Sequence, residues 1–274
     1  MTARPARVVT THLNGRAATV DDLAPLAFAG YAHYTSMQVR GRSVRGLDLH
    51  IDRLARSSAT LFGRAVVAPR VRELLAAALR SSGLTDASAV VTVFSGDGAA
   101  VLHGDAVEPD VLVRVSGAVE PSADPIAVGT VRFARSWPEI KHADTLALTL
   151  HPRRAAAVGR DDVLFVGADD RVSEGSVWNV AFLRGRSVVL PDAPMLPGIT
   201  LQLASAGLRE LGVDVRVEPV RLDELAMFAA AAAMNSIDAG RRIARIDACD
   251  YDDDGALHAL LREAVATQPL QPIS

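Results

Sequence analysis

Residues 138–142, which read Pro-Glu-Ile-Lys-His, contain the only lysine in the 274-residue sequence. Apart from the histidines, every other cationic side chain is an arginine, so a need for surface charge does not by itself explain Lys141. A primary amine at a single position is a candidate for covalent chemistry with carbonyl groups. The alternative is a leftover surface lysine in an arginine-rich composition. Four further short segments, in a fixed order along the chain, favour the chemical interpretation.

These segments lie on both sides of the lysine. His50-Ile51-Asp52-Arg53-Leu54 precedes it. After it come Val172-Ser173-Glu174-Gly175-Ser176 with Asn179, then Leu196-Pro197-Gly198-Ile199-Thr200, then Met234-Asn235-Ser236. Each segment means little alone, but in this order they resemble the fold-type IV (class IV) pyridoxal-phosphate-dependent enzymes. That class includes branched-chain aminotransferases, D-amino-acid aminotransferases and aminodeoxychorismate lyases, and the resemblance covers roughly Tyr34 to Ile246.

The resemblance implies pyridoxal 5'-phosphate as the cofactor. Lys141 matches the catalytic residue that forms a Schiff base with the cofactor aldehyde. Glu174, which lies 33 residues later (174 minus 141), matches the acidic partner of the pyridine nitrogen. The other cofactor-binding positions match residues that hold the phosphate: Arg53, Ile199, Thr200 and Ser236. A guanidinium, a hydroxyl and the N–H groups of a helix start are all suited to a phosphate group.

The substrate-binding positions match the family less completely. Tyr34 and His50 match residues that hold the substrate carboxylate in D-amino-acid aminotransferases, and an ungapped count places His103 opposite another carboxylate-binding histidine. Val101, however, stands where those enzymes carry an arginine. Capture of a carboxylate in the manner of the D-enzymes is therefore not implied in full.

Two enzyme activities remain open from the sequence. The first is a class IV aminotransferase that transfers an amino group between an amino acid and a 2-keto acid through a Lys141 Schiff base. The alternative is β-elimination with pyruvate release, as in 4-amino-4-deoxychorismate lyases. It is suggested by Leu146, which stands where branched-chain enzymes and many D-enzymes carry a tyrosine. A further alternative is a non-catalytic scaffold with this fold. The family also implies a homodimer whose partners are a small amino acid and a keto acid.

Composition argues against several other classes. The formal net charge is −3, so no basic field favours a nucleic-acid partner. Cys249 is the only cysteine, which excludes an internal disulfide framework and a cysteine-based zinc site, and no metal is expected. The longest apolar runs fall short of the roughly 20 residues that span a bilayer, and the N-terminus lacks a secretory signal. We therefore expect a cytoplasmic protein, and the resemblance implies a role in amino-acid metabolism.

Local patterns predict a mixed fold. Apolar spacing and Ser- or Gly-containing ends predict helices at 48–62, 71–84, 200–211 and 255–267, and another from beyond Lys141 to 157. Short β-branched runs predict strands at 89–94, 111–115, 130–133, 163–166, 188–190, 213–217 and 243–246. Helices and strands mix without strict alternation, which favours α+β. With the resemblance, this implies the two-domain fold-type IV arrangement seen in D-amino-acid aminotransferases. We expect a small N-terminal α/β domain at 1–118 and a larger C-terminal, cofactor-binding α/β domain at 119–274, with the boundary in the Gly-, Pro- and Ser-rich stretch 116–129.

Overall fold

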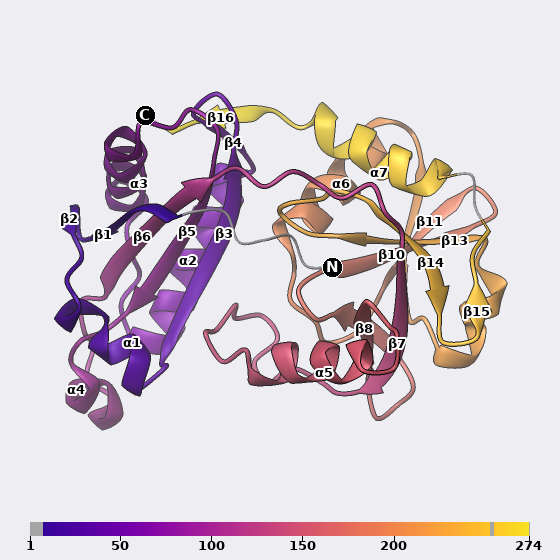
Figure 1. Ribbon diagram of the computed structural model, residues 1–274, viewed down its shortest axis with the longest axis horizontal. Coiled ribbons are helices and arrows are strands. Elements are labelled where there is room, and N and C mark those ends of the chain that lie inside the picture. Colours follow the sequence, from indigo (N-terminus) through magenta and orange to yellow (C-terminus); the bar gives the residue numbers. More distant parts are fainter. Residues whose placement is uncertain (1–7, 253–254, 274) are drawn as a thin grey trace. The chain divides into compact units, whose positions relative to one another are not determined.

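A computed structural model describes residues 8–252 and 255–273. Within them, the chain divides into two compact units (Figure 1). The first unit contains residues 8–119, 140–144 and 270–273, and the second contains 120–139 and the described part of 145–269. Lys141 therefore belongs to the first unit and Glu174 to the second. Strands and helices mix in both units, which confirms the α+β class.

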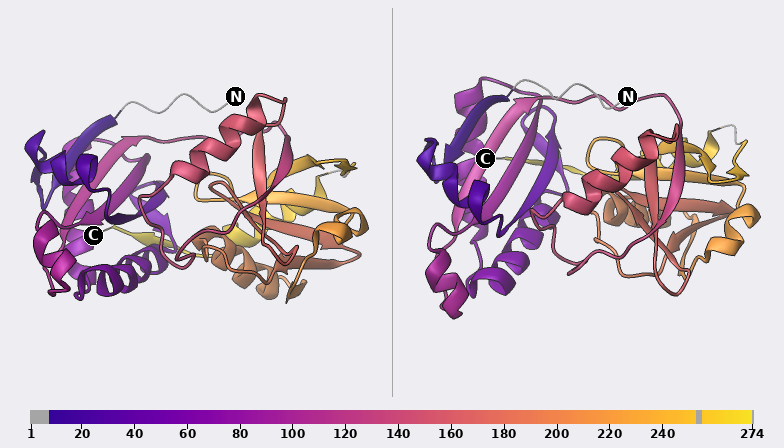
Figure 2. Two further views of the ribbon diagram at one scale, coloured as in Figure 1. Left: turned by 90° about the horizontal axis from the view of Figure 1, so that it is seen from below. Right: turned by 60° about the horizontal axis from the view of Figure 1, so that its bottom comes forward.

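The first unit is built on an antiparallel sheet with the strand order β2-β1-β6-β5-β3. Helices α2 and α3 pack on one face of this sheet, as Figure 2 also shows. Alternate residues of β5 face these helices and are fully buried, because side chains of a strand alternate between its two faces. The elements are β1 (Val8–Leu13), β2 (Arg16–Ala17), β3 (Ala32–Val39), β5 (Ala87–Phe94), β6 (Asp110–Gly117), α2 (Leu47–Phe62) and α3 (Ala68–Ser82).

Helix α2 confirms the helix expected at 48–62 and positions two of the predicted site residues. Ile51 and Leu54 are buried at helical spacing against the sheet. Gly63 ends the helix with a φ of 66°, a left-handed conformation that glycine adopts without steric penalty. The buried face of α2 also carries His50 and Arg53. Both side chains therefore lie in the interior of the first unit.

Two segments that are distant in sequence complete the first unit. β16 (Leu270–Pro272) pairs antiparallel with β4 (Ser43–Arg45), and residues 140–144 lie along β3, where the Tyr34 N–H donates to the Lys141 carbonyl at 2.9 Å. The expected division at 118 and 119 treats each domain as one continuous stretch, whereas the structure joins 140–144 and 270–273 to the unit that contains 8–119. This unit also contains η1 (Asp21–Leu23), α1 (Ala24–Phe28) and α4 (Gly98–His103).

The second unit contains a closed barrel. Its strands follow the order β12-β11-β10-β13-β14-β7-β8-β9, and β9 also pairs with β10, which closes a ring from β10 to β9. Strands β11 and β12 extend the sheet beyond the ring, and β15 pairs with β14. The bounds are β7 (Ile126–Arg132), β8 (Asp162–Val166), β9 (Val172–Gly175), β10 (Asn179–Arg184), β11 (Ser187–Pro191), β12 (Asp214–Glu218), β13 (Ala230–Met234), β14 (Arg241–Ile246) and β15 (Cys249–Asp250).

The alanine-rich stretch forms β13, although alanine favours helices. Ala231 and Ala233 face the apolar core inside the barrel, whereas Ala230, Ala232 and Met234 face helices α6 and α7 on its outside. Burial on both faces with a period of two stabilises a strand over a helix. The helices of the second unit are α5 (Leu146–Ala156), α6 (Ile199–Glu210), η2 (Leu222–Met227) and α7 (Ala256–Thr267).

Most of the expected elements are present. Helices α2, α3, α6 and α7 lie at the expected positions, and all seven expected strands are found. β7 begins at Ile126, inside the stretch expected as a linker, and the helix expected beyond Lys141 begins only at Leu146, because residues 140–144 lie along β3 instead. Among the described residues, no helix has the length and apolar character needed to cross a membrane.

Candidate active site

Lys141 lies beside Tyr34 in the first unit. Its Nζ is 4.9 Å from the centre of the Tyr34 ring, a distance at which an ammonium group is attracted to the ring face. The backbone fixes this arrangement, because the Tyr34 N–H donates to the Lys141 carbonyl at 2.9 Å. The structure therefore brings together the predicted covalent residue and one predicted substrate-binding residue.

Arg53 is a buried cation that forms no ion pair with a carboxylate among the residues that the structure describes. The residue is only 5% exposed, and burial lowers the pKa of its guanidinium to about 10, so the group stays charged at neutral pH. In the described part of the chain, its one hydrogen-bond partner is the hydroxyl of Thr35, which accepts from Nη2, and its buried Nε has none. A buried charge without an opposite charge is unfavourable, so this position favours the binding of an anion.

His50 shares the Thr35 hydroxyl with Arg53. Its Nδ1 lies 2.6 Å from Thr35 Oγ1, and the residue is 3% exposed. Burial, and next the positive charges of Arg53 and Lys141, lower the pKa of His50 well below its usual value, so the imidazole is neutral. His50 can thus donate or accept a hydrogen bond, but it does not supply a cationic partner for a carboxylate.

Glu174 lies on β9 in a buried ion pair that the sequence analysis did not identify. Arg135 Nε is 3.0 Å from Glu174 Oε1, and the two side chains are 3% and 4% exposed. Arg135 follows β7 and lies 39 residues before Glu174, and no local motif links the two positions. The guanidinium lies against the buried carboxylate and offsets part of the cost of burying its charge.

The turn that follows Glu174 has little freedom. A Cβ on Gly175 would lie 2.0 Å from Cε2 of Trp178, so the close approach of the indole requires glycine at this position. The indole N–H donates to Asp162 at 2.9 Å, and the Ser176 hydroxyl donates to the same carboxylate oxygen at 3.0 Å. These bonds attach the turn between β9 and β10 to β8 and hold Glu174 in place at the end of the barrel.

Asn179 links Glu174 to the start of α6. It lies opposite Glu174 in the β9–β10 pair, and its Nδ2 donates to the Leu196 carbonyl at 2.9 Å. A Cβ on Gly198 would lie 2.1 Å from Asn179 Oδ1, so the chain passes very close to this amide. Within the described ranges no side chain caps α6, whose first turn begins with the predicted pair Ile199–Thr200. The first N–H groups of a helix lack intrahelical acceptors and are well suited to an anion.

Ser236 lies in the loop after β13, which starts at the same end of the barrel because Met234 pairs with Asn179. The Ser236 residue is half-buried. The loop is fixed by the buried carboxylate of Asp238, to whose two oxygens Arg262 Nη2, from α7, donates at 2.9 and 3.1 Å. Glu174, the start of α6 and the Ser236 loop therefore gather at one end of the barrel in the second unit.

Two positions from the sequence analysis lie on exposed elements. His103 is exposed at the C-terminal end of α4, and Leu146 is 73% exposed at the start of α5. Neither is on β3 or α2, which carry Tyr34, His50 and Arg53. Within the described residues, no group of three or more His, Cys, Asp or Glu side chains could hold a metal ion.

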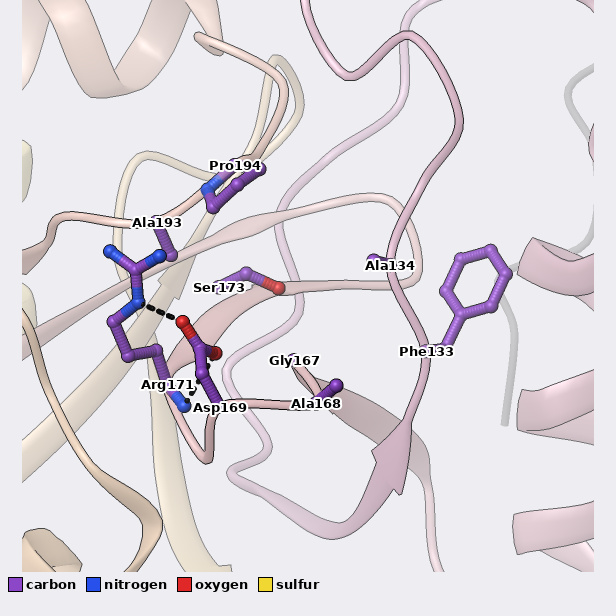
Figure 3. Close-up of a pocket in the computed structure, with 9 residues that line it drawn as sticks. All are labelled: Phe133, Ala134, Gly167, Ala168, Asp169, Arg171, Ser173, Ala193 and Pro194. Atoms are coloured by element: carbon purple, nitrogen blue, oxygen red, sulfur yellow. Dashed lines mark hydrogen bonds and ion pairs between the residues drawn. The ribbon is translucent and has the colours of Figure 1, made fainter.

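A cavity of about 320 Å³ opens elsewhere in the second unit, between residues 133–134, 167–173 and 193–194 (Figure 3). Arg171 and Asp169 form an ion pair at its edge, and Ser173, the residue before Glu174, lines it. Hydrogen bonds from Arg171 lower the pKa of Asp169, so this carboxylate is part of a surface ion pair. None of the predicted site residues lines the cavity.

Comparison with known proteins places this geometry in a family. The family model described as amino-transferase class IV matches residues 32–246. Of the solved structures, a branched-chain amino acid aminotransferase from Thermobaculum terrenum in its PLP-form (holo-form) has a TM-score of 0.84 at 18% identity, covering 98% of this chain and 99% of that one. A fold IV-transaminase from Curtobacterium pusillum has a TM-score of 0.76 at 24% identity and covers 89% of both chains.

A putative 4-amino-4-deoxychorismate lyase from Legionella pneumophila subsp. pneumophila str. Philadelphia 1 is also similar, with a TM-score of 0.79 at 17% identity, over 88% of this chain and 92% of that one. No curated protein matches the sequence. At these identities the structures show the fold alone, and they confirm the fold-type IV arrangement expected from the sequence. The resemblance drawn from the five segments is confirmed by the family model, which spans most of the sequence. This chain belongs to the class IV amino-transferase family.

Proposed function

We propose that this protein is a pyridoxal-phosphate-dependent class IV aminotransferase, which transfers an amino group between an amino acid and a 2-keto acid. When bound, the cofactor supplies an aldehyde that reacts with amines and a pyridine ring that draws electrons from the adjoining carbon. The observation that carries the proposal is Lys141, the single lysine of the sequence, which lies beside Tyr34. The similar branched-chain aminotransferase from Thermobaculum terrenum is described in a PLP-form, which supports the cofactor assignment.

The residues present fit a phosphorylated cofactor. Arg53 has a buried charge and a buried Nε without a partner among the described residues, and a phosphate oxygen would satisfy both. We assign the phosphate also to the uncapped first turn of α6, at Ile199–Thr200, and to the hydroxyl of Ser236. A Cβ at Gly198 would collide with Asn179, so the backbone before this turn is already fixed without a ligand.

Glu174 is assigned to the cofactor's ring nitrogen. A buried carboxylate there would favour a proton on that nitrogen, and the protonated ring withdraws electrons more strongly. Arg135 supports this role by keeping a buried negative charge tolerable at Glu174. An apolar or amide side chain at position 174 would lack the charge that this role needs.

Lys141 is assigned two tasks. Its Nζ would hold the cofactor until the amine of a substrate takes its place, and the released amine would then act as a general base for the proton on the substrate Cα. The same Nζ would return that proton to a carbon of the cofactor. Water would then release the keto acid and leave the amino group on the cofactor, and a second keto acid would take it up in the reverse sequence. Tyr34, at 4.9 Å from Nζ, limits where the amine can move.

We assign the substrate carboxylate to Tyr34, His50 and His103, as the family resemblance implies. His50 is neutral, so its contribution is an N–H donor rather than a charge. His103 is solvent-accessible on α4. We further propose that the protein acts on small amino and keto acids and that it is a homodimer. Sedimentation of the purified protein would test the homodimer.

One observation favours a second activity, β-elimination with pyruvate release. Leu146 occupies the position where branched-chain enzymes and many D-enzymes carry a tyrosine, and it is 73% exposed at the start of α5. Its side chain offers no hydrogen bond to a cofactor or substrate. The same Lys141 amine would serve as the base for elimination, because both reactions begin with removal of the Cα proton.

Dependence on an amino acceptor separates the two activities. Purified protein with the cofactor is supplied with a panel of L- and D-amino acids, with and without a 2-keto acid, and separately with aminodeoxychorismate. An aminotransferase turns over repeatedly only when the keto acid is present, whereas a lyase releases pyruvate without it. Lys141→Ala is the control and should abolish either activity. No turnover in any of these assays would reject both activities and favour a non-catalytic role.

A further inference from the structure

Thr35 connects the two α2 side chains that the site uses. It lies on β3 with 0% exposure, and its Oγ1 contacts both Arg53 Nη2 and His50 Nδ1, the latter at 2.6 Å. His50 and Arg53 are three residues apart on α2, so they occupy the same face of the helix. One hydroxyl therefore bridges both side chains.

The donor and acceptor groups of the three side chains determine the direction of these hydrogen bonds. A guanidinium only donates, so the Thr35 oxygen accepts from Arg53. The hydroxyl has one proton, and in the described part of the chain His50 Nδ1 is the only acceptor recorded for it. A buried hydroxyl proton without an acceptor is unfavourable. The Thr35 proton is therefore directed to Nδ1, and the proton of the neutral His50 ring must be on Nε2.

We infer that Thr35 is a positioning residue, whose hydroxyl holds Arg53 in place and fixes His50 in the Nε2–H tautomer, so that the pair presents only N–H donors to an anion. No described hydrogen bond uses His50 Nε2, and the buried Arg53 Nε also lacks a partner in the described chain. The inference rests on the proposed function, because the anion it serves is the phosphate of the cofactor or the carboxylate of a substrate.

The tautomer can be measured directly, without turnover. Nitrogen NMR of the full-length protein, with its histidine rings labelled with nitrogen-15, distinguishes a protonated from an unprotonated ring nitrogen. A His50→Gln variant identifies the His50 signals. We expect an unprotonated Nδ1 and a protonated Nε2 in the wild type, both with and without the cofactor. A protonated Nδ1 in the wild type would overturn the inference, whatever the variants do.

Thr35→Val removes the hydroxyl at nearly constant volume, and Thr35→Ser restores it. We expect Thr35→Val to shift His50 towards a mixture of tautomers and to weaken binding of pyridoxal phosphate about tenfold, as for the loss of a hydrogen bond to a charged group. Thr35→Ser should recover most of both properties. Thr60→Val is a matched control on the exposed part of α2 and should change neither.

Pyridoxal, which lacks the phosphate, distinguishes an effect of Thr35 on the phosphate site from an effect on the rest of the cofactor. If Thr35 acts through the phosphate site, Thr35→Val should lower the affinity for pyridoxal phosphate much more than the affinity for pyridoxal. Wild type that binds neither compound would reject the proposed function. Wild type that binds pyridoxal phosphate normally, with Thr35→Val of equal affinity and an unchanged tautomer, would reject only the role of Thr35. If Thr35→Val fails to fold, the His50 tautomer of the wild type and the tautomer and cofactor affinity of Thr35→Ser still test the role of Thr35.

Discussion

The Arg135–Glu174 ion pair gives a prediction whose magnitude follows from burial. The two side chains are 3% and 4% exposed, and Nε and Oε1 are 3.0 Å apart. Arg135→Met would remove the guanidinium that pairs with this buried carboxylate, and breaking a buried ion pair in this way typically lowers the free energy of unfolding by about 3–5 kcal/mol. The matched control is Arg245→Met in the same unit, which breaks an ion pair with Asp250 whose side chains are 47% and 62% exposed. That change should leave the free energy of unfolding nearly unchanged, because solvent screens an exposed ion pair.

Both tryptophans of the sequence, Trp137 and Trp178, lie in the second unit, so their fluorescence during urea unfolding reports on the unit that contains the ion pair. The double variant Arg135→Met/Glu174→Gln removes both charges and should recover a large part of the loss seen with Arg135→Met. A loss of less than about 1 kcal/mol for Arg135→Met, or a double variant less stable than the single one, would refute the argument that the pair is a coupled buried unit.

Three further predictions concern pH, the start of α6 and the Ser236 loop. His33 is buried, and burial and the nearby Arg53 lower its pKa to about 3 from 6.5, so the unfolded chain binds the extra proton between these values. Calorimetry should therefore show stability that is complete above pH 6.5 and falls with decreasing pH, by up to about 1.4 kcal/mol per pH unit for this histidine, and His33→Gln should flatten the profile. Gly198→Ala should weaken binding of pyridoxal phosphate at least about tenfold, because its Cβ would lie 2.1 Å from an amide oxygen and the start of α6 must shift; unchanged affinity would contradict this. Asp238→Asn removes the charge that Arg262 binds, and it should weaken the binding of pyridoxal phosphate about threefold or more while changing the binding of pyridoxal little. Equal effects on the two affinities would show that the loop does not act on the phosphate.

The helices could be predicted because each has a local signal. α2 and α3 have apolar residues at helical spacing and end at Gly63 and Gly83, which adopt left-handed conformations with φ of 66° and 72°. β9 could not be predicted in this way, because it is a four-residue strand whose stability comes from pairing with both β8 and β10. Closure of the barrel depends on such pairings between distant segments, which single-strand patterns do not contain.

The same distinction applies to the candidate site. Lys141, Arg53 and Glu174 could be proposed from the order of short motifs. Arg135 and Thr35 could not, because an arginine after a strand and a threonine within one have no local feature that indicates a role. Their roles arise only when folding places Arg135 against Glu174, 39 residues away, and Thr35 against Arg53, 18 residues away.

The most direct test of the central claim is the visible absorption spectrum of the purified protein with pyridoxal phosphate, recorded beside Lys141→Ala. Because Lys141 is the only lysine, borohydride reduction followed by peptide mass spectrometry can assign any covalent link to a single ε-amine. We predict a visible band in the wild type that shifts when an amino donor is added, a reduced cofactor attached to Lys141, and no such band in Lys141→Ala. No band in the wild type, or a band that the substitution leaves unchanged, would contradict the assignment of Lys141 as the residue that holds the cofactor.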